Sequence, residues 1–138
     1  MADTVTVTQL NDGIRYCEYE FTNESDGTGE TTITKIDLTN LVGSTGALTG
    51  GDRPTSLTFV DGDWEVNGFN YVNVLWDRQA ANKLIETMVD SGGVDLFPAG
   101  GKRDPARDLD GTGDILLTTD GGADGSGYRI RMRFRKKY

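Results

Sequence analysis

Four arginines at alternate positions near the end of the chain are the residues with the most distinctive chemistry. The last ten residues carry a charge of +6 without a single acid, whereas the whole chain carries −8 at pH 7, so residues 1–128 must carry −14. Guanidinium groups suit carboxylates because they form two parallel hydrogen bonds with them. The pattern predicts a basic strip, formed by Arg129, Arg131, Arg133 and Arg135.

The spacing of these arginines indicates the element that positions them. Successive side chains of a strand point to opposite faces, so the arginines share one face and the residues between them share the other. That second face is apolar and is expected to enter a hydrophobic core. It comprises Tyr128, Ile130, Met132 and Phe134.

Three kinds of partner fit the basic strip. The first is a neighbouring strand of the same subunit, because the first and last long strands of a jelly roll are adjacent and antiparallel. Cross-strand pairs of this kind contribute about 0.2–1 kcal/mol each. The second is an acidic surface of another protein, or of further copies of this chain. The third, nucleic acid, ranks last because the −14 on residues 1–128 would repel it. The expected cross-strand pairs join Glu18 and Glu20 to Arg131 and Arg133.

The chain contains no histidine and a single cysteine, Cys17. Ser-His-Asp and Cys-His catalysis, most zinc sites and most general-base chemistry near neutral pH depend on imidazole. Cys17 is interpreted as a small buried hydrophobe, because a reactive thiol needs activating neighbours. Pairs of acids, such as Asp61 with Asp63, arise by chance among 22 acids. We therefore expect no enzyme activity and no cofactor.

An acidic, glycine-rich stretch at residues 108–114 raises one metal-binding alternative. Asp108, Asp110 and Asp114 could supply the oxygen ligands that Ca²⁺ prefers. An EF-hand needs a carboxylate at the twelfth loop position, which counted from Asp108 is Thr119. The preferred interpretation is a turn that leads into a strand.

Turn residues divide the chain into short extended segments, which is typical of an all-β protein. Glycine accounts for 19 of 138 residues and clusters, often beside aspartate, between stretches rich in β-branched and aromatic residues. About eight strands predict a two-sheet sandwich of the jelly-roll type, with a seven-stranded immunoglobulin-like sandwich as the alternative. The expected strands are 13–23, 30–38, 55–60, 63–67, 69–76, 83–89, 114–119 and 127–136.

Three other segments bear on the organisation of the chain. Residues 77–89 also suit a short helix by composition, although strand is preferred. Residues 91–113, with two prolines and six glycines, predict a long loop with one brief extended piece at "VDLF". Residues 1–12 predict an N-terminal arm, able to add a strand to a neighbour's sheet, ahead of a single domain at 13–138. Neither a membrane span nor a signal peptide is recognisable, so we expect a protein made and kept in the cytosol.

Four stretches of the sequence, in order and approximate spacing, resemble the small head decoration, or cement, proteins of tailed bacteriophages. Residues 43–70 and 101–110 depart from that pattern. The stretches that carry the resemblance are "FTNESDGTGETTITKIDL" at 21–38, "VLWD" at 74–77, "GTGDILLTT" at 111–119 and "GYRIRMRFRKKY" at 127–138.

The resemblance implies a jelly-roll fold, trimers at local three-fold positions of a capsid, and no catalysis. Its implied partners are the major capsid protein and further copies of the chain. Its implied location is the virion, after assembly in the bacterial cytoplasm. The segments expected to make contacts are 2–12, 91–113 and 128–137. The residues expected at interfaces are Arg129, Arg131, Arg133, Arg135, Trp76, Arg103 and Arg107.

The alternative function belongs to a different class, a carbohydrate-binding module of a phage fibre or base plate. It rests on aromatic residues that could stack on sugar rings, or that could instead divide between the core and contacts between subunits. These residues are Trp64, Phe69, Tyr71 and Trp76. A small glycosidase built on paired carboxylates ranks third.

Overall fold

The computed structural model describes residues 3–43, 53–78, 81–104 and 112–138. Within these ranges the chain forms strands and two short 3-10 turns, η1 (Leu38–Asn40) and η2 (Phe97–Ala99). The strands are β1 (Thr4–Asp12), β2 (Tyr16–Asp26), β3 (Ile33–Ile36), β4 (Ser56–Asn67), β5 (Phe69–Trp76), β6 (Lys83–Met88), β7 (Ser91–Asp95), β8 (Ile115–Gly121) and β9 (Asp124–Lys137).

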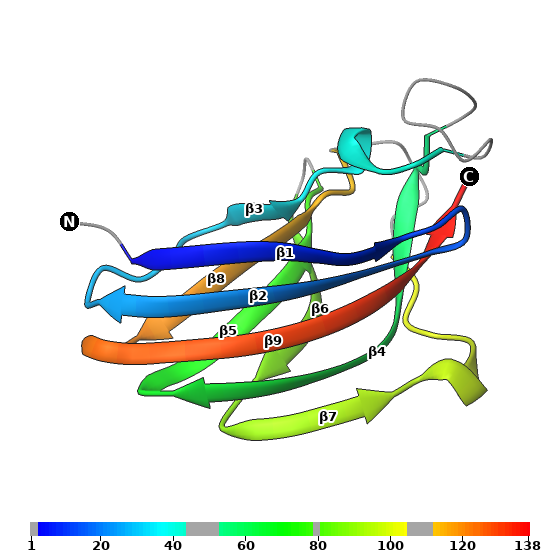
Figure 1. Ribbon diagram of the computed structural model, residues 1–138. Coiled ribbons are helices and arrows are strands. Elements are labelled where there is room, and N and C mark those ends of the chain that lie inside the picture. Colours follow the sequence, from blue (N-terminus) through cyan, green and yellow to red (C-terminus); the bar gives the residue numbers. More distant parts are fainter. Residues whose placement is uncertain (1–2, 44–52, 79–80, 105–111) are drawn as a thin grey trace.

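The strands form two antiparallel sheets packed face to face (Figure 1), one in the order β1-β2-β9-β4-β7 and the other in the order β3-β8-β5-β6. The strands pair in a nested series: β2 with β9, β3 with β8, β4 with β7, and the consecutive β5 with β6. This is the strand order of a jelly roll, with β1 added at one edge. The predicted fold class, an all-β two-sheet sandwich of the jelly-roll type, is confirmed.

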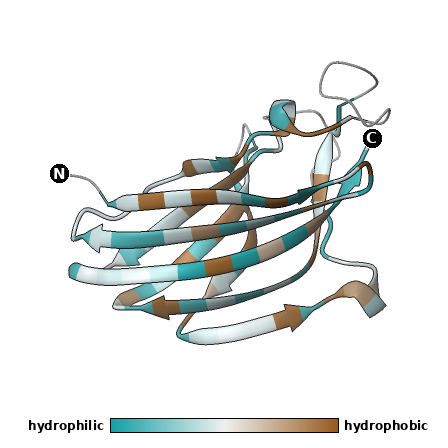
Figure 2. Cartoon of the chain, viewed as in Figure 1, coloured by the Kyte–Doolittle hydropathy of each residue, from teal (hydrophilic) through white to brown (hydrophobic). Residues whose placement is uncertain are grey.

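Period-two alternation in β2 and β9 builds the core. Apolar side chains of these strands point between the sheets and are fully buried, among them Phe21, Ile130 and Phe134. Val72 and Val74 of β5 meet them from the opposite sheet. Bands of opposite hydropathy alternate along the second half of β9 in Figure 2. The expectation that the apolar face of the last strand enters the core is therefore confirmed.

The predicted strands 55–60 and 63–67 are a single strand, β4. The intervening Asp61-Gly62 pair, which suits a turn by composition, lies instead in the ladder with a shift of register just before it. A Cβ atom at Gly62 would lie 2.6 Å from the carbonyl oxygen of Arg131. Glycine here permits a close approach of two strands rather than a turn.

One further segment agrees with the preferred sequence-based expectation, and another differs from it. Residues 83–88 form strand β6, as preferred over the helix. Residues 91–95, placed within the long loop at 91–113, form strand β7, which pairs with β4 from Asp61 to Glu65. The strand propensity of Ser-Gly-Gly-Val-Asp is low, so pairing with β4 rather than local preference accounts for it.

The residues expected to form an N-terminal arm lie in β1, which pairs antiparallel with β2 of its own chain from Thr4 to Asp12. Asp3 anchors the start of this strand. Its carboxylate accepts hydrogen bonds from Ser25 Oγ at 2.9 Å and from the backbone N–H groups of Asp26 and Gly29, each at 3.2 Å. Thr4–Asp12 is thus a strand of the sandwich.

Candidate functional site

The basic strip lies at the centre of the larger sheet, because β9 runs between β2 and β4. Both neighbours place acids at the same register positions as the arginines. Arg131 is flanked by Glu20 and Asp63. The next arginine along β9, at position 133, is flanked by Glu18 and Asp61. The predicted adjacency of the first and last long strands is confirmed.

Three of the arginines form ion pairs with these acids. Arg131 Nη2 lies 2.7 Å from Asp63 Oδ2, and its Nη1 lies 3.1 Å from Glu18 Oε1. Arg129 Nη2 lies 3.0 Å from Glu20 Oε2. The hydrogen bonds that Arg131 donates to Asp63 and then to Glu18 raise the pKa of its guanidinium. The partly exposed pairs contribute about 0–1 kcal/mol each, since water screens them.

The fourth pair, between Arg133 and Asp61, lies beside η2. The ring centroid of Phe97 lies 4.7 Å from Arg133 Cζ, and 5.7 Å from the ring centroid of Tyr16 on β2. A guanidinium over an aromatic face is attracted by the ring quadrupole. The turn therefore folds over the outer face of the sheet near the end of β9. The first kind of partner considered for the basic strip, a neighbouring strand of the same subunit, is therefore present in the structure.

Arg135, the last arginine of the strip, differs from the other three. Its register neighbours are the uncharged Tyr16 and Thr58. Its Nη2 donates a hydrogen bond to the carbonyl of Gly100 at 2.8 Å. Arg103 is exposed and lines the same small cavity as Arg135. Arg107, also expected at an interface, lies outside the described residues.

Trp76, expected at an interface, is enclosed by its own subunit. The side chain is 1% exposed, and its Nε1 donates a hydrogen bond to the carbonyl of Leu57 at 2.8 Å. Val72, Val74 and Trp76 share the inward face of β5, which explains the burial. The ring is therefore not available to a partner or to a sugar.

The other aromatic residues considered for sugar stacking do not share a surface with Trp76. Phe69 is buried in the core. Trp64 is half-buried, packs against the core and donates through Nε1 to the carbonyl of Val89 at 3.3 Å. Tyr71 lies half-buried on β5, in the other sheet. The four rings do not form one exposed platform.

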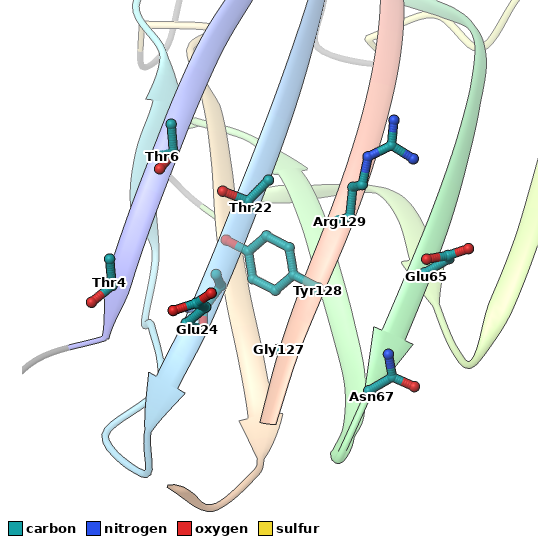
Figure 3. Close-up of a pocket in the computed structure, with 10 residues that line it drawn as sticks. Thr4, Thr6, Thr22, Glu24, Glu65, Asn67, Gly127, Tyr128 and Arg129 are labelled. Carbon is teal, nitrogen blue, oxygen red and sulfur yellow. The ribbon is translucent and has the colours of Figure 1, made fainter. Parts of the chain in front are cut away.

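A shallow hollow lies at the other end of the same sheet face, over Gly127. Its volume is about 500 Å³. Its lining residues lie on the adjacent strands β1, β2, β9 and β4, and Figure 3 shows their hydroxyl, carboxylate, amide and guanidinium groups. Tyr128 also borders it but offers no ring for stacking, since its buried hydroxyl donates to Glu30. The polar side chains around the hollow are Thr4, Thr6, Thr22, Glu24, Glu65, Asn67 and Arg129.

A buried polar network near this hollow is absent from the sequence-based expectations. Glu30 and Lys35 form an ion pair with both side chains buried. Tyr128 and Asn23 Nδ2 also donate to Glu30, the amide at 3.1 Å. Burial, followed by the hydrogen bond to Glu30, raises the pKa of Tyr128. Nothing in the sequence indicates that Glu30 and Lys35, five residues apart in a polar stretch, are both buried.

Strand β1 presents an open edge to solvent. It is the outermost strand of its sheet, and within the described residues no segment pairs with its far side. Val5 and Val7 are 42% and 43% exposed, and Leu10 is similarly uncovered. Val5 and Val7 lie opposite Asn23 and Phe21 of β2, both buried, so they belong to the inward side of the sheet. The opposite sheet does not cover this side along β1.

The described ranges hold neither a metal-binding cluster nor a membrane-spanning helix. No cluster of three or more His, Cys, Asp or Glu residues in them could hold a metal ion. No helix in them has the length and apolar character needed to cross a membrane. Asp108 and Asp110, considered as calcium ligands, lie outside the described residues, and Asp114 Oδ1 accepts a hydrogen bond from the Leu38 N–H at 2.9 Å.

Comparison with protein-family models finds no match, and comparison with curated proteins also finds none. Among solved structures, the chain is similar to a cupin domain from Bordetella pertussis Tohama I. The two share 6% sequence identity with a TM-score of 0.41, over 100% of this chain and 98% of the other.

Proposed function

We propose that this chain is a non-catalytic virion structural protein that decorates and stabilises an assembled phage capsid as a homotrimer at local three-fold positions. The resemblance of four sequence stretches to head decoration proteins supports the proposal. In the structure, the open edge of β1 supports it most strongly. The major capsid protein and further copies of the chain are the proposed partners, and the virion is the proposed location.

An open strand edge suits assembly because its backbone N–H and C=O groups can pair with another chain. β1 is nine residues long and alternates threonine and valine at its start. Soluble proteins commonly protect such edges with lysine, proline or a bulge. β1 carries neither lysine nor proline, and its one irregularity lies toward its end, between Gln9 and Asn11. The first half of the strand is therefore the best-suited segment for an extended partner.

The arginines have a smaller part in this proposal than the sequence suggests. Arg129, Arg131 and Arg133 already contact carboxylates of their own subunit. A partner would have to replace those pairs, so it would gain little from the exchange. We accordingly place the main contact at the β1 edge and a secondary one at Arg135.

The proposed mechanism is stabilisation by selective binding. A protein that binds the assembled lattice and not its separate subunits stabilises the lattice by mass action. Three copies joined in a trimer act together, since binding of one raises the effective concentration of the others. Weak individual contacts at the β1 edge would then suffice.

The test combines light scattering after size exclusion with sedimentation of capsids from a phage that encodes the chain. We expect a mass near three times 15.0 kDa and co-sedimentation with capsids. The double variant V5K/V7K should weaken capsid binding by about tenfold or more, because it charges the edge. Leu84→Lys is the matched control, since Leu84 is equally exposed, at 47%, but lies on β6 of the other sheet. A monomer that does not sediment with capsids would refute the proposal.

A further inference from the structure

A cavity of about 320 Å³ lies where β9 ends beside the start of β4. Arg135 and Lys137 border it from β9, Ser56 and Thr58 border it from β4, and Arg103 borders it from the segment after η2. Three cationic side chains and two hydroxyl groups thus surround one small space. The chain otherwise has a strong excess of acids, so this concentration of positive charge is unusual for the molecule.

The register of β9 explains why the charge here is not neutralised within the sheet. Arg135 has Tyr16 and Thr58 at its sides, whereas the arginines before it have acids. Lys137 has Ser56 at its side. Among the described residues, no carboxylate forms an ion pair with Arg103, Arg135 or Lys137.

Two other charged residues at the cavity are engaged elsewhere. Lys136 points to the opposite side of β9, where its ammonium binds Asp12 and the carbonyl of Val42 at 2.8 Å. Asp104 forms an ion pair with Arg78, in which both side chains are buried. The net charge that the cavity offers to a ligand is therefore positive.

Backbone hydrogen bonds to β4 hold in place the segment that carries Arg103. Lys102 N donates to the carbonyl of Phe59 at 2.7 Å, and Phe59 N donates to the carbonyl of Lys102 at 2.9 Å. Gly101, at φ +85°, packs so closely on Thr58 that a Cβ atom would lie 2.7 Å from Thr58 Cγ2. These contacts fix residues 101 and 102 against β4 before any ligand binds. Ligand binding therefore needs to order less of this segment.

We propose that this cavity is a binding site for a small tetrahedral oxyanion, phosphate or sulfate, free or as a monoester. Arg135 and Arg103 supply guanidinium donors, Lys137 supplies a point charge, and Ser56 and Thr58 supply hydroxyl donors. This donor set matches the acceptor oxygens of a phosphate group. A nucleic-acid strand fits less well, because the acidic remainder of the molecule repels an extended polyanion. The site shares Arg135 with the secondary contact proposed above, but its test uses the isolated protein and needs no capsid.

The test is isothermal titration of the intact protein with inorganic phosphate, sulfate and phenyl phosphate, at constant ionic strength set with chloride. We expect saturable binding of one anion per chain. Arg135→Gln should weaken binding by about tenfold or more, because it removes a charge-assisted donor. The matched control is Arg129→Gln, on the same strand but paired with Glu20 at the other end of the sheet, and it should bind as the wild type does.

Phenyl phosphate distinguishes the two sources of the anion. Equal affinity for phenyl phosphate and inorganic phosphate indicates a site open to esters, whereas binding of the inorganic anions alone indicates a site for the free ion. Should Arg135→Gln fail to fold, Lys137→Gln at the exposed end of β9 gives the same measurement. Absence of saturable binding, unchanged binding in both variants, or equal loss in Arg129→Gln would each overturn the proposal.

Discussion

Arg131 on β9 contacts Asp63 on β4 through two nitrogens, with Nη2 at 2.7 Å and Nε at 3.0 Å from the same carboxylate oxygen. Its remaining Nη1 reaches Glu18 on β2. One side chain thus joins three adjacent strands on the outer face of the sheet. The charge separation in the sequence, acidic body and basic last strand, becomes a local alternation of charge once the strands pair.

This contact predicts a measurable but small coupling between Arg131 and Asp63. In a double-mutant cycle with Arg131→Gln and Asp63→Asn, we expect a coupling free energy of about 0.5 kcal/mol, since the side chains are 33% and 48% exposed. Urea denaturation at low and high salt provides the measurement, and the coupling should shrink at high salt. A coupling above about 2 kcal/mol would show that the pair is desolvated in solution.

Charge reversal on the same strand tests whether the arginines of the basic strip stabilise their own subunit or contact a partner. The variant R131E/R133E places two new acids among Glu18, Glu20, Asp61 and Asp63, so we expect a loss of stability from like-charge repulsion. Restoring opposite charges with D61R/D63R in the same chain should recover most of that loss. A reversal variant that remains as stable as the wild type, yet loses its partner, would instead place these arginines at an interface.

The buried pair of Glu30 and Lys35 predicts a much larger effect. Lys35→Met leaves the Glu30 carboxylate buried without its cation, which should cost about 3–5 kcal/mol of unfolding free energy. The double variant with Glu30→Gln removes the stranded charge and should recover about half of the loss. Thermal and urea unfolding measure both. Lys83→Met, exposed on β6, is the control and should change stability by no more than about 0.5 kcal/mol.

The fold class could be predicted from the sequence because alternation and turn residues are local signals. β9 and β2 show this most clearly, since apolar and charged residues alternate through 128–135 of β9 and 17–21 of β2. β7 could not be predicted with the same ease, since Ser-Gly-Gly-Val-Asp has little intrinsic strand preference and depends on pairing with β4. Asp61-Gly62 suits a turn by composition but lies within β4, because it pairs with β7 and β9.

The candidate sites depend on register, which the sequence does not show. Arg135 differs from Arg131 only because Tyr16 and Thr58 lie beside it, and those residues are more than 70 positions away along the chain. Trp76 looks like a possible contact residue until the inward face of β5 is known. Sequence reasoning therefore located the basic strip but could not distinguish its paired part from its unpaired end.

The single thiol provides a test at alkaline pH. Burial is the main cause that raises the pKa of Cys17 to about 12, with Asp12 adding to it and Lys136 opposing it. A folded-state pKa above the ordinary 9.0 means that the native state keeps a proton that the unfolded chain releases, so stability falls as pH rises above about 9. Thiol-reactive reagents at pH 8 should therefore modify Cys17 only after unfolding. Rapid modification of the native protein would contradict the burial of this residue.

Asp3 gives the corresponding test at acidic pH. Burial acts to raise the pKa of Asp3, but hydrogen bonds from Asn23, Ser25 and the backbone of Gly29 and Asp26 outweigh it and lower the pKa below its ordinary 3.8. The stabilisation is therefore complete above the unfolded pKa and is lost as pH falls through the folded one. Asp3→Asn should reduce unfolding free energy near neutral pH, and the difference from wild type should disappear in acid.

Denaturation curves collected from neutral pH down to below pH 3.8 measure this difference directly. Glu86→Gln, which removes a carboxylate from β6 in the other sheet, is the control for the change in net charge. Because Asp3 fixes the start of β1, Asp3→Asn should also speed hydrogen exchange of the Gly29 amide. A variant with unchanged stability and unchanged exchange at Gly29 would show that β1 is held by its pairing with β2 alone.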